Sequence, residues 1–401
     1  MKTEIPVIVA ARRTPIGRHG GGLASVRPDD LLALIISDLL KLTGIPPTDI
    51  GDVIVGCANQ AGEDNRNVAR MASLLAGLPW TVTGVTINRL CGSSLDAVIQ
   101  AARAVTLGDA EVILATGVES MSRAPWSVPK PEVAYATGTQ SMYDTSLGWR
   151  FPNPRLAILF PLESMGETAE NLAQHFRLDR DLQDAYAYQS HQRALLAQAQ
   201  GWFAAEILPV SVAEKKQTRT IDTDEGPRPD TTPDRLAKLK PAFRDPGTVT
   251  AGNSSTLNDG AAGVVITSER YASARKLPIL SRIAGWGVAG VDPRHMGLGP
   301  VPATVKALNH AGWKFSDLEA IELNKAFAAQ SLSVLRSWEM PYDSAVVNAH
   351  GGAIALGHPL GASGARITAT LLHRMQQHHQ HKGLATMCIG VGQGISVLLE
   401  C

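Results

Sequence analysis

The feature that most constrains the fold of this chain is an internal repeat. The segment Asp49–Ile54 has a counterpart in Asp317–Glu322, in the second half of the chain. At nearly the same distance after each copy comes a glycine-containing turn that opens a helix, with Cys91 in the first turn and His358 in the second. A repeat of this kind predicts one supersecondary unit that is used twice.

Strand-like and helix-like segments alternate along both copies, which favours an α/β architecture with a mainly parallel sheet. Apolar periodicity in the first copy predicts strands at Pro6–Ala11, Asp52–Gly56, Gly84–Asn88 and Glu111–Gly117, and helices at Pro28–Thr43, Arg66–Leu75 and Ser93–Leu107. The stretch 122–247 differs, because it combines proline and aromatic clusters, a periodic helix at Asp181–Gln200 and a polar run at Glu214–Asp234. We therefore expect an N-terminal half at 1–121 plus 248–272, an inserted loop subdomain at 122–247, and a C-terminal half at 273–401.

Composition excludes several classes of function. The 401 residues include 37 basic and 37 acidic side chains, and 44% of the chain is hydrophobic. This balance predicts a folded protein and argues against nucleic-acid binding, which favours a basic surface. Apolar runs are too short for a membrane span, and the first residues are typical of a strand rather than a secretory leader, so we expect a cytoplasmic protein.

The four cysteines form no CxxC pair, which argues against a disulfide framework or a metal site. Cys91 lies between an apolar strand and a helix, where unsatisfied N–H groups favour a thiolate and the N–H of Cys91 could serve an oxyanion. A buried structural cysteine is an equally good interpretation of this residue alone. Cys57 and Cys401 have no such setting and are interpreted as structural or incidental.

His358 lies in the glycine-rich segment Gly351–Gly364, and Cys388 begins a second one, Cys388–Gly394. A cysteine and a positioned histidine supply a nucleophile and its base. A second thiol is useful where another proton must move, for example from a carbon acid. The alternative for Cys388 is a small buried residue that ends a strand.

With these residues in place, the chain resembles the thiolases, which are acyl-CoA:acetyl-CoA C-acyltransferases, from end to end. The segments that match family signatures are Arg13–Gly17, Asn88–Leu95, Val118–Ser122, Thr250–Asn253, Asn258–Ala262, Gly351–Gly364 and Cys388–Gly394. The loop Gly56–Met71 and the segment Gly148–Phe151 are similar to the branch that acts on 3-oxoadipyl-CoA in aromatic-acid breakdown. The resemblance implies a duplicated fold, with two βαβαβαββ-type halves in five α/β/α/β/α layers and an inserted loop subdomain.

The resemblance also implies a reversible Claisen reaction through an acyl-enzyme. Cys91 would attack the 3-oxo carbon, Cys388 would move the α-proton of acetyl-CoA, and His358 would activate Cys91. His358, with a water held by Asn324, would stabilise the thioester enolate, while the N–H groups of Cys91 and Gly390 would form a second oxyanion hole. The implied coenzyme A contacts are Ser164, Met165, Arg228 and Ser255.

In this interpretation coenzyme A and acetyl-CoA are substrates, no cofactor is bound permanently, and the protein is a homodimer or homotetramer. Three alternatives remain open: a biosynthetic acetoacetyl-CoA thiolase, a decarboxylating condensing enzyme, and a catalytically impaired thiolase-like structural subunit. The condensing enzyme is disfavoured because its third catalytic group resembles a histidine or asparagine rather than Cys388.

Three positions depart from the family pattern. Lys325 follows Asn324 where the family usually has glutamate, Ser94 stands where glycine is usual, and His350 stands where asparagine is usual. A cation near the site would lower the pKa of a catalytic thiol. Alternatively, Lys325 turns away and pairs with an acid such as Glu322.

Overall fold

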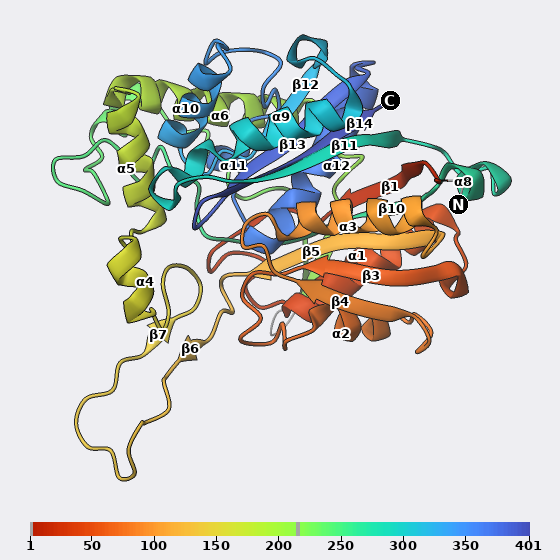
Figure 1. Ribbon diagram of the computed structural model, residues 1–401, viewed down its shortest axis with the longest axis horizontal. Helices are drawn as coiled ribbons and strands as arrows, with labels where there is room; N and C mark the ends of the chain where they lie inside the picture. The colour runs from red at the N-terminus through yellow and green to blue at the C-terminus, as the bar shows by residue number, and fades with distance from the viewer. Residues whose placement is uncertain (1–2, 214–216) are drawn as a thin grey trace.

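The computed structural model describes residues 3–213 and 217–401 (Figure 1). The first three residues of the predicted polar run, 214–216, lie outside the described residues. The elements of the N-terminal half are β1 (Pro6–Arg13), β2 (Gly17–Arg18), α1 (Pro28–Thr43), β3 (Ile50–Gly56), α2 (Val68–Leu75), β4 (Thr83–Ile87), α3 (Ser93–Leu107), β5 (Val112–Ser120), β10 (Asn258–Ser268) and α8 (Glu269–Ala274). Those of the C-terminal half are β11 (Ser281–Gly290), α9 (Pro300–Ala311), β12 (Ala320–Leu323), α10 (Ala328–Ser337), α11 (Ala353–Leu356), α12 (Ser363–Gln377), β13 (Lys382–Ile389) and β14 (Gln393–Glu400).

Strand pairing confirms the duplication. In the N-terminal half β3 pairs in parallel with β4 and β5, and β10 pairs antiparallel with β5 and β1. In the C-terminal half β12 pairs in parallel with β13, and β14 pairs antiparallel with β13 and β11. The third strand of this half is reduced to one parallel bridge between Ile321 and Val347. The two βαβαβαββ units join where β1 pairs with β11.

The predicted mainly parallel sheet is wrong, because most of these pairings are antiparallel. Each half ends on a strand that returns beside its predecessor, β10 against β5 and β14 against β13. Alternation of helices and strands identifies the parallel part of each unit, but the direction of the last strand depends on its connection. Between β13 and β14 that connection is a tight turn, which permits only antiparallel pairing.

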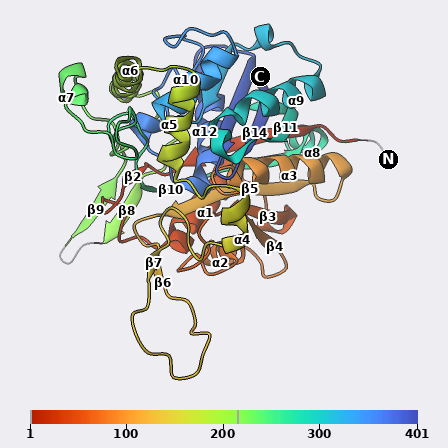
Figure 2. The same ribbon diagram turned by 60° about the vertical axis from the view of Figure 1, so that its left-hand side comes forward.

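Helices α3 and α12 pack together between the two halves of the sheet, while α1 and α2 cover the N-terminal half and α9 and α10 the C-terminal half (Figures 1 and 2). The middle layer buries Leu95 and Val98 of α3 against Ile367 and Leu371 of α12. This gives the five layers expected of the fold. The turns before α3 and α12 therefore meet at one end of the middle layer.

Local signals fix several helix ends. Helices α1 and α3 have the predicted bounds, and each is closed by a left-handed glycine, Gly44 at φ 63° and Gly108 at φ 80°. Glycine adopts this conformation without the steric cost that a side chain brings.

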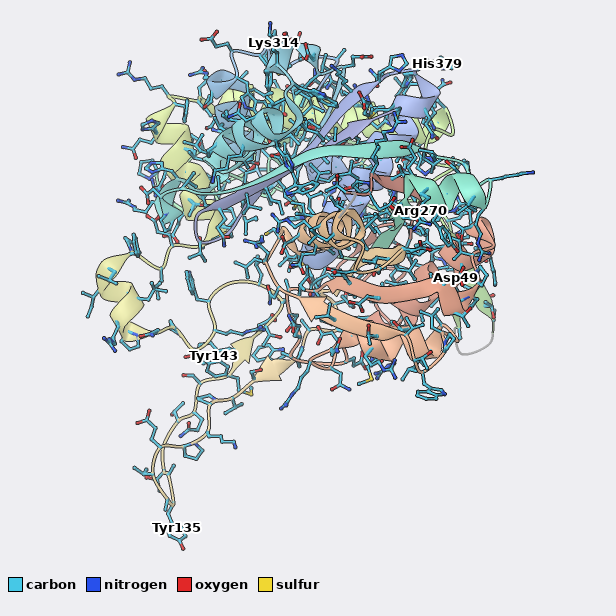
Figure 3. The ribbon with its side chains drawn as sticks, turned by 45° about the vertical axis from the view of Figure 1, so that its right-hand side comes forward. Asp49, Tyr135, Tyr143, Arg270, Lys314 and His379 are labelled. Atoms are coloured by element: carbon cyan, nitrogen blue, oxygen red, sulfur yellow. The ribbon has the colours of Figure 1, made fainter. Side chains whose placement is uncertain are left out.

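The insert contains β6 (Trp126–Ser127), β7 (Tyr143–Asp144), α4 (Pro154–Leu159), α5 (Met165–His175), α6 (Arg180–Ala199), β8 (Val210–Ala213), β9 (Thr218–Ile221) and α7 (Pro233–Ala237). Its segment between β6 and β7 projects from the molecule, with Tyr143 at the base and Tyr135 at the tip (Figure 3). Helices α5 and α6 instead pack against α10 and α11, beside the catalytic loops. In the described part of the chain, no helix is long and apolar enough to cross a membrane.

Candidate active site

Cys91 lies in a strained turn between β4 and α3 that its neighbours hold in place. Leu90 has a left-handed backbone with φ 47°, and its N–H donates to Asn88 Oδ1 at 2.8 Å. Ser93 Oγ accepts the N–H of Arg89 at 2.9 Å and donates to the carbonyl of Leu90 at 2.6 Å. These local hydrogen bonds offset the cost of the left-handed residue, on the order of 1–3 kcal/mol, and fix where Cys91 points.

The thiol of Cys91 accepts the backbone N–H groups of Gly390 and of Cys91 itself. These N–H groups lower its pKa, but burial raises it more, to about 11. The predicted resident thiolate is therefore wrong, because desolvation outweighs the N–H groups at the start of α3. A base must remove the proton of Cys91 as it reacts.

Cys388 lies at the end of β13, where burial raises the pKa of its thiol. Cys91 is close enough that a charge on it raises this pKa further. The turn after β13 contains Gly390 and then Val391, a β-branched residue at φ 63°. Such a conformation is costly for valine and directs the Gly390 N–H toward Cys91. Both thiols are thus flanked by strained turns.

The imidazole of His358 is held in one tautomer. Ser363 Oγ lies 2.6 Å from His358 Nδ1 and donates its single proton to the carbonyl of Pro359 at 2.8 Å. The hydroxyl oxygen therefore accepts a hydrogen bond from the Nδ1–H group, so the proton of the neutral ring is on Nδ1 and Nε2 is unprotonated. Burial lowers the pKa of His358 to about 3, so this ring is neutral and Nε2 is a free base.

Asn324 follows β12 and lies beside this ring, with its amide nitrogen 3.3 Å from His358 Nε2. The Asn324 backbone N–H donates to the carbonyl of Thr386 on β13 at 3.0 Å, which fixes the segment. The site is thus formed by side chains at the ends of two strands, β12 and β13, and in the turns before two helices, α3 and α12. In that order, these side chains are Asn324, Cys388, Cys91 and His358.

Direct contact between α3 and α12 brings the thiols and the histidine together. Ser94 Oγ accepts the N–H of Ala365 at 2.8 Å. A Cβ added at Gly364 would lie 2.1 Å from the backbone nitrogen of Leu95, so only glycine permits this approach. The turn of Cys91 and the turn of His358 are therefore neighbours, although they are far apart in sequence.

Comparison with known proteins identifies the family. The family model "Thiolase, N-terminal domain" matches residues 6–270, and "Thiolase, C-terminal domain" matches residues 277–401. The chain belongs to the thiolase family. Thiolases are acyltransferases, and this protein is an enzyme of that class.

Similar proteins include thiolases of several organisms. The chain is 53% identical over 390 residues to the 3-oxoadipyl-CoA/3-oxo-5,6-dehydrosuberyl-CoA thiolase of Escherichia coli, covering 97% of each chain. It is 51% identical over 395 residues to a beta-ketoadipyl-CoA thiolase of Acinetobacter baylyi, covering 98% of each. The crystal structure of the Bacillus anthracis acetyl-CoA acetyltransferase matches with a TM-score of 0.94 and 40% identity, covering 100% of this chain and 99% of that one.

Three of the four residues predicted to contact coenzyme A lie beside this thiolase site. Ser164 caps α5 and Met165 begins it, and the Met165 sulfur lies against Gly390. Ser255 donates its backbone N–H to the carbonyl of Ala326, two residues after Asn324. Arg228 is exposed, and its backbone N–H donates to His191 on α6. From the insert, Ser164 and Met165 thus lie near Gly390, and the binding of coenzyme A by all four residues stays a prediction.

Glu119, at the end of β5, is a site residue that the sequence interpretation missed. Its carboxylate accepts the backbone N–H groups of Ala58 at 3.0 Å, Asn59 at 3.1 Å and Gly361 at 2.7 Å. Burial raises its pKa to about 7, against the lowering by these N–H groups. The sequence signal for such a role is an acidic residue at the end of an apolar strand, and in the sequence Glu119 stands out only as a member of the signature Val118–Ser122.

Cys57 is buried beside this carboxylate and Asp64, and the three ligand atoms lie within 4.8 Å of one another. Asp64 accepts the N–H groups of Gln60 and Gly62, so both acids already have backbone donors. Burial and the two neighbouring carboxylates raise the pKa of Cys57, which makes it an inert thiol. Its predicted structural role fits these contacts.

Lys325 is buried, and its Nζ lies 4.4 Å from the ring centroid of Tyr186 on α6. Glu119, not Lys325, is the charged residue whose field acts on the Cys91 thiol. The predicted lowering of a catalytic pKa by Lys325 is therefore wrong, because successive residues after β12 face opposite ways. The alternative prediction, that Lys325 turns away and pairs with Glu322, agrees better with the structure, because the charge of Glu322 attracts that of Lys325. No hydrogen bond joins the two side chains in the described residues.

Proposed function

We propose that this thiolase-family protein cleaves 3-oxoadipyl-CoA with coenzyme A to give acetyl-CoA and succinyl-CoA. The observation that carries the proposal is the convergence of two thiols, a neutral imidazole and the Gly390 N–H at one site. The substrate class is supported by the names of the relatives in Escherichia coli and Acinetobacter baylyi.

In the first half-reaction, His358 Nε2 takes the proton of the Cys91 thiol while the sulfur attacks the 3-oxo carbon. The bond between carbons 2 and 3 then breaks, its electron pair forms the enolate of acetyl-CoA, and Cys388 gives that enolate a proton. Asn324 and His358 stabilise the enolate oxygen. A pKa near 11 for Cys91 makes the base necessary, since few thiolates exist at neutral pH.

In the second half-reaction, Cys388, which the first half-reaction left deprotonated, takes the proton of the coenzyme A thiol as that sulfur attacks the acyl group on Cys91. The N–H groups of Gly390 and Cys91 stabilise the oxyanion, and the Cys91 sulfur leaves and recovers its proton from His358. Both N–H groups already point at the sulfur, so they are oriented before charge develops on the oxyanion.

The test combines turnover with two variants. The parent protein should release acetyl-CoA from 3-oxoadipyl-CoA and coenzyme A, and Cys91→Ser should form no acyl-enzyme. Cys388→Ala should still be acylated at Cys91 but should lose deuterium exchange at the α-carbon of acetyl-CoA. Cys401→Ser, at an exposed thiol, is the matched control and should behave as the parent. Acylation in Cys91→Ser or unchanged exchange in Cys388→Ala would reject the assigned roles.

Synthesis of acetoacetyl-CoA is the second candidate, because the Bacillus anthracis structure of similar fold is named an acetyl-CoA acetyltransferase. The ratio of kcat/KM for 3-oxoadipyl-CoA to that for acetoacetyl-CoA distinguishes the two. A ratio well above one supports the first candidate. Absence of turnover with both substrates would instead favour an impaired structural subunit.

We also propose a homodimer or homotetramer. Strand β4 is an edge strand, and apolar side chains around it are exposed, notably Trp80 at 79% and Leu75 at 56%. Such an edge and patch favour pairing with a second copy. Light scattering of the parent and of Val85→Lys on β4 tests this, since the variant should reduce the assembled fraction.

The division into 1–121 plus 248–272, 122–247 and 273–401 remains a proposal of the same kind. It is supported by the two family matches, which meet between residues 270 and 277. Limited proteolysis should cut first within 122–247.

A further inference from the structure

Arg150 lies in the insert, between β7 and α4, with its side chain half-buried. Its Nη1 donates to Asn59 Oδ1 at 3.0 Å, and its Nη2 donates to the Asn59 carbonyl at 2.9 Å. Both acceptors are uncharged. A guanidinium has five N–H donors, so this arrangement leaves three for another partner.

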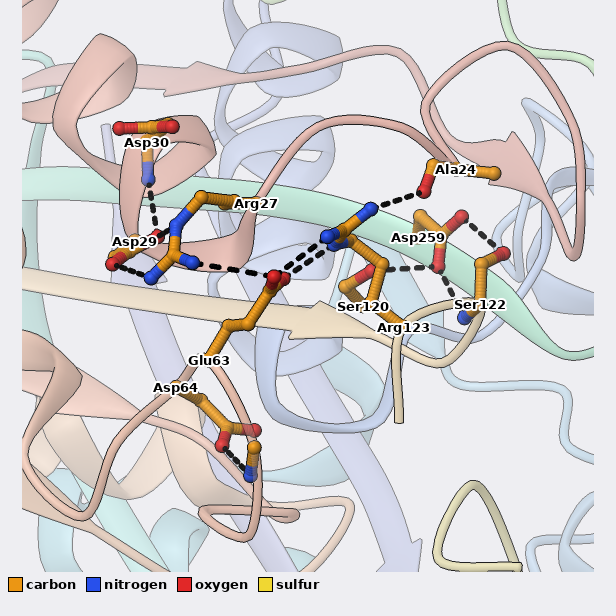
Figure 4. Close-up of polar contacts among 11 residues, drawn as sticks. Ala24, Arg27, Asp29, Asp30, Glu63, Asp64, Ser120, Ser122, Arg123 and Asp259 are labelled. Atoms are coloured by element: carbon orange, nitrogen blue, oxygen red, sulfur yellow. Dashed lines mark hydrogen bonds and ion pairs between the residues drawn. The ribbon is translucent and has the colours of Figure 1, made fainter. Parts of the chain in front are cut away.

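Three other arginines near this end of the molecule are matched by acids. Arg27 and Arg123 share Glu63 (Figure 4), and Arg89 pairs with Asp96. In the described part of the chain, Arg150 forms no ion pair with an acidic side chain. A half-buried cation whose charge has no partner is suited to an anion that arrives with a ligand.

Asn59 connects this cation to the catalytic turn. Its backbone N–H donates to Glu119, and its side-chain amide donates to Thr145 at 3.2 Å, so it is held from both sides. The preceding carbonyl, of Ala58, accepts a hydrogen bond from Asn88 at 2.9 Å. Asn88 in turn fixes the N–H of Leu90, directly before Cys91. The guanidinium is therefore positioned by the same hydrogen bonds that shape the nucleophile turn.

Trp149, the residue before Arg150, lies near the turn that contains Gly390. It lines a narrow cavity together with Met165 and Val391, and these two residues flank Gly390, whose N–H points at the Cys91 sulfur. The indole N–H of Trp149 donates to the carbonyl of Glu163 at 3.1 Å, which fixes the segment that contains Arg150. The apolar side chains of Trp149, Met165 and Val391 thus line a cavity next to Gly390. Arg150, whose charge has no acidic partner, is the residue that follows Trp149 in the sequence.

We propose that Arg150 binds the distal carboxylate of a dicarboxylic 3-oxoacyl-CoA and so determines the acyl specificity of this thiolase. The inference rests on the proposed function, in which the acyl group left on Cys91 is succinyl. Its carboxylate lies only two methylenes from the carbonyl carbon, so the matching cation must stand close to the nucleophile. An uncharged acyl chain would leave Arg150 facing a methyl group, which disfavours that substrate.

The experiment compares two substrates in three variants. The parent protein, Arg150→Met and Arg150→Lys are assayed with 3-oxoadipyl-CoA and with acetoacetyl-CoA, which lacks the distal charge. Arg150→Met should lower kcat/KM for 3-oxoadipyl-CoA by about 10- to 150-fold, the value of a charge-assisted hydrogen bond. It should change kcat/KM for acetoacetyl-CoA by less than about threefold. The kcat/KM of Arg150→Lys for 3-oxoadipyl-CoA should lie between those of the parent and Arg150→Met, because lysine keeps the charge but lacks the planar guanidinium that binds a carboxylate with two N–H groups.

Arg155→Met is the matched control, because Arg155 is an exposed arginine on the neighbouring helix α4. Arg155→Met should leave kcat/KM unchanged for both substrates. Equal losses for both substrates in Arg150→Met would show that Arg150 only supports the loop and would overturn the proposal. An unchanged ratio in an active variant would overturn it as well.

Failure of the proposed function gives a different result. A parent protein that turns over acetoacetyl-CoA but not 3-oxoadipyl-CoA rejects the dicarboxylic substrate and the role of Arg150 together. A parent that prefers 3-oxoadipyl-CoA, with the same preference in Arg150→Met, rejects only Arg150. Acylation of Cys91 by succinyl-CoA and by acetyl-CoA in a single turnover supplies an independent measure of the same ratio.

Discussion

Glu119 at the end of β5 and Glu322 on β12 are both buried carboxylates near the catalytic loops, one in each half, but their surroundings differ. Glu119 accepts three backbone N–H groups, and no cation pairs with it among the described residues. Glu322 accepts one hydrogen bond, from Asn348, and the cations Arg374, Arg366 and Lys325 act on it. The backbone N–H groups around Glu119 fix the position of its carboxylate, whereas the cations around Glu322 determine the net charge of its surroundings.

The difference has a structural consequence. Glu119 ties the loop after β3 to the turn before α12, so it connects the two halves at the site. Three buried cations act on Glu322, and Glu206 and Asp224 also attract Arg366. Lys325 Nζ and two nitrogens of Arg366 have no hydrogen-bond partner in the described residues. Lys325, at a position where the family resemblance leads us to expect a glutamate, adds to the positive charge around Glu322.

The largest expected effect comes from removing the acid of the second cluster. Glu322→Ala should lower the free energy of unfolding by about 3–5 kcal/mol, because Arg374 loses its ion-pair partner and Arg366 and Lys325 lose a nearby negative charge. Urea unfolding measures this, with the exposed Glu132→Ala as the control. If charge balance is the cause, the loss should shrink when Lys325→Met is added, and an additive double variant would contradict it.

Glu119→Gln tests whether the backbone N–H groups that donate to Glu119 stabilise the loops around it. The amide nitrogen of glutamine cannot accept an N–H, so one donor of Ala58, Asn59 or Gly361 is left unsatisfied at a cost of about 1–3 kcal/mol. Because those donors shape the loop beside Cys91, the acylation rate of Cys91 should also fall. Urea unfolding and single-turnover acylation are the measurements, and a variant that keeps both would show that Glu119 does not hold these loops.

Lys325→Met should stabilise the protein by up to about 4 kcal/mol at low pH, because it removes a buried charge without an adequate partner. Burial and Arg193 lower the pKa of Lys325 from 10.5 to about 7. Between these values the unfolded chain holds a proton that the folded chain does not, so the stability of the parent rises with pH in that window. The advantage of the variant should therefore be complete below pH 7 and disappear toward pH 10.5. A constant advantage across this range would mean that Lys325 does not titrate there.

The smallest expected effect concerns a neutral donor–acceptor pair between the halves. Ser94→Ala removes the acceptor for the Ala365 N–H and should cost about 1 kcal/mol, with no dependence on pH. Thermal unfolding at two pH values measures it. A pH-dependent loss would mean that charge, not backbone hydrogen bonding, dominates this contact.

The sequence by itself determined what depends on neighbouring residues. The bounds of α1 and α3 follow from apolar periodicity and from Gly44 and Gly108, which close the helices locally. The repeat predicted the duplicated fold, and glycine-rich turns marked Cys91 and His358. The family resemblance, carried by ordered motifs, supplied the thiolase chemistry.

The tertiary structure decided what depends on residues distant in sequence. The direction of β10 and β14 follows from which strand each one meets, and burial makes the Cys91 thiol neutral despite its place before a helix. Glu119 became a site residue only because Gly361 folds against it. The side to which Lys325 turns and the unmatched charge of Arg150 have the same origin. Desolvation and charge pairing depend on the full three-dimensional surroundings, which no local pattern specifies.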